Sequence, residues 1–203
     1  MHESERWNVY SHLIGVVLSV IGLLPLTYYS FLTGDVYKII GISVYGVCLV
    51  LLFLCSTIYH SSTGNKREFM QKMDHCSIFL LIAGTYTPFM LITLRETSGI
   101  YILAAIWLIS ALGILFKFYF AHRFEFVSTL FYLFCGWLII FDFQNFYNLF
   151  QGPGFYWLAA GGLAYSIGAV FFLWERIPKN HEIWHVFVLA GGFSHYISIF
   201  YLV

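Results

Sequence analysis

The sequence alternates between long apolar runs and short polar connections. Seven runs lie at residues 8–30, 38–60, 74–94, 99–118, 124–142, 155–174 and 181–203, and each is close to the roughly 20 residues that a helix needs to cross a bilayer. Backbone polar groups in lipid must be satisfied within the segment, so such runs form helices. The pattern predicts an all-α membrane protein, a bundle of seven transmembrane helices that forms a single domain over residues 1–203.

Composition agrees with this prediction and excludes other classes of protein. Hydrophobic residues make up 60% of the chain and charged residues only 10%, whereas soluble domains carry about 25% charge. The net charge is zero, so nothing suggests a nucleic-acid partner. The four cysteines lie in apolar runs without CxxC spacing, which argues against a disulfide framework. The first residues are not a basic signal segment, so we expect the first run to be a retained span.

The basic residues predict the orientation of the bundle. With seven spans, two of the ten Lys and Arg residues fall on one side, Lys38 and Arg95. The other eight fall on the side of the N-terminus: Arg6, Lys66, Arg67, Lys72, Lys117, Arg123, Arg176 and Lys179. Basic residues accumulate on the cytoplasmic side of membrane proteins. We therefore expect the N-terminus in the cytoplasm and the C-terminus outside.

Small residues predict where helices pack closely. Ala160, Ala164 and Gly168 recur every four residues in the sixth apolar run, and Gly191 and Gly192 thin the seventh. Stripes of small residues let helices approach one another in lipid. We expect these positions to lie at contacts between helices.

A pair of histidines, His181 and His185, opens the last apolar run. Residues four apart share one face of a helix, and ionisable side chains at membrane depth are costly, which favours a functional role. Two neutral imidazoles at this spacing are a common way to hold a transition metal. The alternative is a pair of interfacial histidines that hydrogen-bond to neighbouring residues or lipid headgroups.

Other polar residues are expected at the same depth. His60 ends the second run and Asp74 opens the third, both at the predicted cytoplasmic face, where Ser11 and His12 also lie near the start of the first run. Three imidazoles and a water form a catalytic zinc site in which the water's pKa falls to about 7. Asp74 is the candidate to orient that water and take its proton. Ser56 precedes His60 by one helical turn and shares its face.

Each of these residues also has a purely structural interpretation. Asp74 begins the third predicted helix and would act as its N-cap, a role that is compatible with the catalytic one. Ser56 would bond back to a carbonyl of its own helix. Cys55 and Cys76 flank the site, but buried free cysteines are ordinary packing residues. His195 lies ten residues beyond His185, about 15 Å along a helix, so we expect a hydrogen-bonded histidine inside the bundle.

The string His181-Glu182-x-x-His185 also matches the metalloprotease pattern in which the glutamate is the general base. Glu182 has a simpler role as a negative charge in the first turn of a helix, where the helix dipole favours it. An intramembrane protease is therefore a minor alternative.

Several segments, taken in order, resemble the hemolysin III family within the wider progestin and adiponectin receptor (PAQR) group. They are Asn8-Val9-Tyr10-Ser11-His12, Ser56-Thr57-Ile58-Tyr59-His60, Lys72-Met73-Asp74-His75, Gly84-Thr85-Tyr86-Thr87-Pro88 and His181-Glu182-Ile183-Trp184-His185 with the residues that follow it. The resemblance implies a seven-helix bundle with the N-terminus inside. It also implies zinc near the cytoplasmic side, held by His60, His181 and His185, with Asp74 and Ser56 beside the metal-bound water.

The adiponectin receptors and the related alkaline ceramidases suggest, by resemblance, hydrolysis of lipid amides such as ceramide. We therefore expect a zinc-dependent hydrolase of a lipid amide or ester, whose substrate enters laterally from the membrane, with Asp74 and Ser56 as catalytic residues. The short chain is typical of bacterial members, so the expected location is a bacterial plasma membrane and the expected partners are membrane lipids. The other hypotheses are a sensor of membrane state with structural zinc and a cytolytic protein. Imidazole also suits metals other than zinc.

Overall fold

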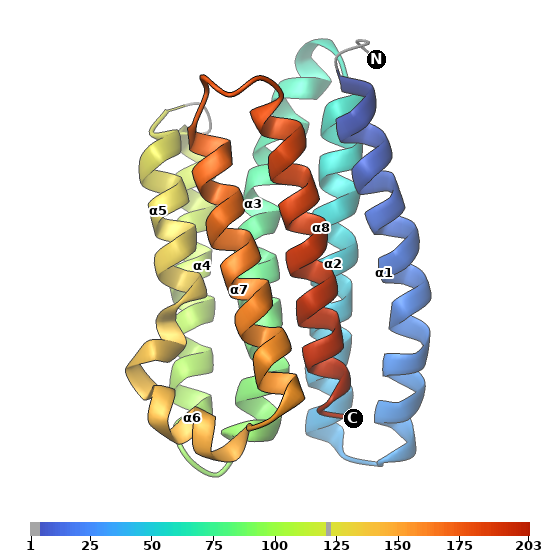
Figure 1. Cartoon of the computed structure of the whole chain (residues 1–203), viewed down its shortest axis with the longest axis vertical. Coiled ribbons are helices and arrows are strands. Elements are labelled where there is room, and N and C mark those ends of the chain that lie inside the picture. The colour runs from blue at the N-terminus through green and yellow to red at the C-terminus, as the bar shows by residue number, and fades with distance from the viewer. Residues whose placement is uncertain (1–4, 121–122) are drawn as a thin grey trace.

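The computed structural model describes residues 5–120 and 123–203, which form a bundle of long helices (Figure 1). In chain order the helices are α1 (Arg6–Leu32), α2 (Val36–Ser61), α3 (Gly64–Pro88), the π-helix η2 (Phe89–Thr93), α4 (Gly99–Phe120), α5 (Glu125–Gly136), the 3-10 helix η3 (Leu138–Asp142), α6 (Phe143–Leu149), α7 (Pro153–Leu173) and α8 (Asn180–Phe200). Seven helical segments of this described part are long and apolar enough to cross a membrane. The predicted fold class is therefore confirmed.

The start of α1 and the end of α8 lie at opposite ends of the bundle (Figure 1). α8 packs against α7 and α1, while α3 packs against α2, α4 and α5. α3 is the most enclosed span, with 67% of its most apolar window buried inside the protein. The polar residues Ser77, Thr85 and Thr87 in this span are therefore buried against other helices. Which end of the bundle faces the cytoplasm stays a prediction from the distribution of basic residues.

Two spans differ from the predicted ranges. α3 begins at Gly64, ten residues before the predicted start, because the polar stretch ahead of Asp74 is rich in Lys, Arg, Glu and Gln, which favour helix. The fifth span breaks after Gly136 and continues as η3 and α6. The Tyr86 hydroxyl donates to the Gly136 carbonyl (3.0 Å) and accepts from the Ile139 amide (2.9 Å). These bonds satisfy backbone groups that the break would leave unpaired in lipid.

The buried face of α1 is polar, in contrast to its apolar outer face. Five of its seven buried residues are small or polar and lie close to helical spacing: Asn8, His12, Gly15, Ser19 and Ser30. Gly15 faces the ring of Phe53 on α2, where an added Cβ would come within 2.5 Å. α1 can therefore approach α2 closely, and this approach carries Asn8 and His12 into the protein interior.

α7 and α8 also pack through small residues, but in a different register from the predicted one. Gly161 and Gly168 are buried, and a Cβ on Gly168 would lie 2.6 Å from Cβ of Phe187. Ala160 is exposed, so its prediction as a contact residue is wrong. An α-helix has about 3.6 residues per turn, so positions spaced by four move progressively around the helix and away from the contact face. Gly191 on α8 lies against the ring of Tyr165, as its predicted contact role requires.

We expect Gly168→Ala to destabilise the bundle, because its added methyl would overlap Cβ of Phe187, which is fixed to the α8 backbone. Overpacking of this kind costs about 1–3 kcal/mol, and each kcal/mol corresponds to about 2–4 °C in Tm for a protein of this size. Thermal melting in detergent measures the effect. Gly136→Ala is the control, because nothing lies within 4 Å of its added methyl. Equal melting temperatures for the two variants would contradict the packing account.

Candidate metal centre

Three histidines from two helices meet at the end of the bundle where α2 ends and α8 begins. His60 lies in the last turn of α2, and His181 and His185 lie in the first two turns of α8. Nε2 of His181 is 3.2 Å from Nε2 of His60 and 3.2 Å from Nε2 of His185. The ligand atoms of the three histidines all lie within 4.8 Å of one another, close enough to hold one metal ion. They are the group of His, Cys, Asp and Glu residues in the described ranges that meets this condition. His60 is far from His181 and His185 in the sequence, and the fold brings the three histidines together as predicted.

The outer ring nitrogens of two of these histidines are hydrogen-bonded. Nδ1 of His60 lies 2.7 Å from Oε2 of Glu5, and because a carboxylate only accepts, Nδ1 carries the proton. Nδ1 of His185 lies 3.2 Å from Oγ of Ser11, whose own proton goes to the Asn8 carbonyl (3.1 Å). His185 therefore also donates from Nδ1. In both rings this leaves the Nε2 lone pair pointing at the other histidines, as metal-ligating imidazoles require.

These protonation states make the cluster incomplete without a cation. His181 can donate at most one proton from Nε2, so at least one of its two 3.2 Å contacts would bring two lone pairs together. A tetrahedral ion with Zn–N bonds near 2.0–2.1 Å separates its ligand nitrogens by about 3.3–3.4 Å. The two separations from Nε2 of His181, 3.2 Å each, are close to that value. The donor set therefore fits a metal ion such as zinc, while the identity of the ion is a separate question.

Glu5 is the residue of this site that the sequence did not single out. Its carboxylate accepts from His60, from the Arg67 guanidinium (2.6 Å) and from the Asn8 amide (2.9 Å). Burial raises the pKa of Glu5, but the hydrogen bonds from Asn8, Arg67 and His60 outweigh burial and lower the pKa to about 2. The group is therefore ionised at neutral pH. The signal that could have found it is the spacing of Glu5, Asn8 and His12, which share one face of a helix.

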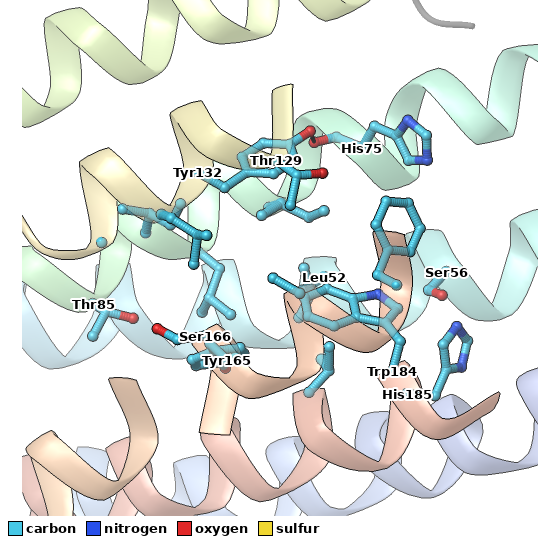
Figure 2. Close-up of a pocket in the computed structure, with 18 of the residues that line it drawn as sticks. Leu52, Ser56, His75, Thr85, Thr129, Tyr132, Tyr165, Ser166, Trp184 and His185 are labelled. Carbon is cyan, nitrogen blue, oxygen red and sulfur yellow. Dashed lines mark hydrogen bonds between the residues drawn. The ribbon is translucent and has the colours of Figure 1, made fainter. Parts of the chain in front are cut away.

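A cavity of about 140 Å³ begins at the histidines and runs between α2, α3, α5, α7 and α8. Asp74 and Ser56 line it together with His181 and His185. Figure 2 shows the Ser56 hydroxyl next to the ring of His185, with Thr85 and Ser166 further along the cavity. Much of the remaining wall is apolar and includes Leu52, Ile78, Leu81, Ile82 and Val188. This shape suits an amphipathic molecule whose polar part lies at the histidines.

The structural interpretations of Asp74 and Ser56 do not survive. Asp74 lies ten residues inside α3, so it is not the N-cap of that helix. Ser56 Oγ is buried and does not bond back to its own helix; its hydroxyl interacts with the Asp74 carboxyl group instead. Asp74 is outside the group of mutually close ligand atoms in the described ranges. The pair therefore lies beside the histidine cluster, on the wall of the cavity.

Other candidates lie outside the cluster. Cys55 and Cys76 do not belong to the group of ligand atoms found among the described residues. Nε2 of His195 lies 3.2 Å from the Leu158 carbonyl, as expected for a hydrogen-bonded histidine inside the bundle. Glu182 lies in the first turn of α8 and pairs with Lys179 at 3.5 Å. It is not among the residues that line the cavity, which weakens the protease interpretation.

Comparisons with known proteins give the family. The model of the family described as "Haemolysin-III related" matches residues 2–196. The chain is 45% identical to "Hemolysin-3" of Bacillus cereus, over 99% of this chain and 92% of that one. It is 40% identical to the "Hemolysin-3 homolog" of Bacillus subtilis, over 98% of this chain and 94% of that one. It is also 31% identical to the human "Monocyte to macrophage differentiation factor", over 95% of this chain and 81% of that one. The chain is therefore a multi-pass membrane protein that belongs to the hemolysin III family, with relatives of the PAQR type.

Proposed function

We propose that this protein is a zinc-dependent hydrolase of membrane lipids and that it acts in membrane-lipid homeostasis. Its substrates would be lipid amides that resemble ceramide, or lipid esters. The observation that carries the proposal is the opening of the buried histidine cluster onto a largely apolar cavity that Asp74 and Ser56 also line. A purely structural metal site is normally closed by four protein ligands. Here the described residues supply three, and the open side faces a cavity that suits an acyl chain.

His60, His181 and His185 would hold the ion, which supplies a Lewis acid and lowers the pKa of a water to about 7. Zinc is preferred because three neutral imidazoles with an open position are typical of catalytic zinc sites. Glu5 and Ser11 keep the Nε2 atoms of His60 and His185 unprotonated and fix the ring orientations. These contacts favour neutral ligands at neutral pH.

Asp74 would act as the general base and then as the general acid. As the water oxygen bonds to the acyl carbon, Asp74 takes one of its protons. When the bond from the acyl carbon to nitrogen breaks, Asp74 returns that proton to the leaving amine. The products are a fatty acid and an amine. Ser56, which interacts with Asp74 on the same wall, would orient the water or the carbonyl oxygen.

The substrate would enter laterally from the lipid. The entry would lie between α5 and α7, because Thr129 and Leu133 on α5 and Ala169 and Phe172 on α7 line the cavity. This route would leave the headgroup near the histidines and the acyl chain among apolar side chains. By the distribution of basic residues, the site would face the cytoplasm, in a bacterial plasma membrane.

A second candidate function is suggested by the names of the two Bacillus relatives, "Hemolysin-3" and "Hemolysin-3 homolog". A cytolytic role would not need the histidine cluster. A non-enzymatic sensor of membrane state would keep the metal but need no turnover. Zinc content, lipid turnover and red-cell lysis distinguish these three functions.

The purified protein is expected to contain one zinc per chain, and the double variant His181→Ala/His185→Ala is expected to contain none, because it removes two of three ligands. Metal analysis of the detergent-purified protein measures this. His195→Gln on the same helix is the control, since its ring bonds to the Leu158 carbonyl and lies outside the cluster. Metal-free wild type would remove the proposed mechanism. Red-cell lysis that persists in a variant without all three histidines would favour the cytolytic role.

Asp74→Asn is expected to keep its zinc and lose turnover of ceramide or of another long-chain acyl amide by about 10²–10⁴-fold, since an amide side chain cannot take the proton. Product release measured by mass spectrometry tests this. Asp142→Asn is the control, because Asp142 lies on η3 at the other end of the bundle (Figure 1). Zinc-loaded wild type that turns over no acyl-amide or ester lipid would point to the sensor role instead.

Glu5→Gln is expected to weaken zinc binding by about 10–100-fold, because loss of an outer-sphere carboxylate usually has an effect of that size. Gln retains an acceptor for His60 but not the charge, so Glu5→Ala should weaken binding further. Competition with a chelator measures the affinity. Glu96→Gln is the control, because Glu96 is 89% exposed and pairs with Arg95 instead. An affinity equal to that of wild type would show that Glu5 does not support the ligands.

A further inference from the structure

His12 on α1 lies directly against the histidine cluster. Its ring stacks on that of His185, with 3.7 Å between the ring centroids and 11° between the planes. The ring of Phe53 meets it edge-on at 5.2 Å. The close approach of α1 to α2 at Gly15 sets this position. The imidazole is therefore held between two rings, and its orientation is fixed by packing.

Both ring nitrogens of His12 are buried and make no hydrogen bond to any part of the chain that the structure describes. The residue is 3% exposed and lines the cavity. A neutral imidazole carries one donor and one acceptor, and leaving both unpaired in a buried site is costly. Ser56 and Asp74, which interact with each other, line the same cavity. The two unsatisfied nitrogens of His12 thus lie where the cavity meets the histidine cluster.

Metal ligation does not account for His12. The close group of ligand atoms contains His60, His181 and His185, and His12 is outside it. Structural hydrogen bonding does not account for it either, in contrast with His195, whose ring bonds to the Leu158 carbonyl at 3.2 Å. A buried polar group without a partner needs an explanation, and one that lines a cavity is explained by a ligand that completes it.

We propose that His12 is a substrate-binding residue, whose neutral ring donates an N–H to the acyl carbonyl oxygen of the lipid. This inference rests on the proposed hydrolase function and adds a residue to it. The acyl carbonyl is the acceptor that amides and esters share. As water adds to the acyl carbon, negative charge grows on that oxygen and the hydrogen bond from a fixed donor strengthens. The stack on His185 would place the donor beside the ion without taking up a coordination position.

The test replaces His12 with apolar side chains. His12→Phe keeps a ring against His185 and removes both nitrogens. His12→Leu removes both nitrogens and the ring. Both variants should keep one zinc per chain. Without ligand they should melt about 2–4 °C higher than wild type, since they remove unpaired buried polar atoms. Thermal melting in detergent is then repeated with N-methylhexadecanamide, with hexadecane as the probe that lacks a carbonyl.

We expect the amide to raise the Tm of wild type, as a ligand of the folded state does. Both His12 variants should need at least tenfold more amide to reach the same rise in Tm. His195→Phe is the matched control. It should melt below wild type, because it removes the hydrogen bond from the ring to the Leu158 carbonyl, and its zinc content should not change. The amide response of wild type should exceed its response to hexadecane.

Three results would overturn the proposal: an amide response in the His12 variants equal to that of wild type, loss of zinc from both variants, or a fall in their unliganded Tm like that of His195→Phe. Loss of zinc would make His12 a support of the metal site. If wild type itself does not respond to the amide, the proposed amide substrate fails, and the role of His12 towards its carbonyl fails with it. If wild type responds but does not turn the amide over, hydrolysis alone fails.

Discussion

The convergence of three imidazole Nε2 atoms inside an apolar bundle is the constraint on which the rest of the structure depends. The positions of the protons on the three rings explain this dependence. Glu5 fixes the proton of His60 on Nδ1, the Asn8–Ser11 pair does the same for His185, and His181 can supply at most one proton to the space between the rings. A cation completes such a cluster. The ionised Glu5 then places a negative charge behind the ligands, where it favours binding of that cation.

The membrane environment explains how such a polar site is built. In lipid the outer surface of the bundle is apolar, so polar side chains collect inside it. α1 shows this arrangement, with Asn8, His12 and Ser19 turned inward. α3 brings Asp74 to the cavity because it is the most enclosed span. Close packing at Gly15 and Gly168 brings the helices near enough to place these groups together.

Much of this arrangement could be predicted from sequence, because hydropathy and helical periodicity are local signals. Apolar runs gave the seven spans, and the four-residue spacing of His181 and His185, together with the shared depth of His60, gave the cluster. The start of α3 was missed because hydropathy marks the membrane-embedded part of a helix and not its polar extension, which also produced the wrong capping role for Asp74. The contact register at Gly161 depends on how α7 rotates against α8, which no local pattern contains.

Glu5 shows why predicting site residues from their depth in the membrane misses some of them. It precedes the first span and looks like an ordinary surface carboxylate, and only the fold brings it to His60 on α2. X-ray absorption at the zinc edge of the purified wild-type protein would test the account most directly. The account predicts three imidazole nitrogens at about 2.0–2.1 Å and one further light-atom ligand. A sulfur ligand at about 2.3 Å, fewer than three imidazoles, or no bound zinc would contradict it.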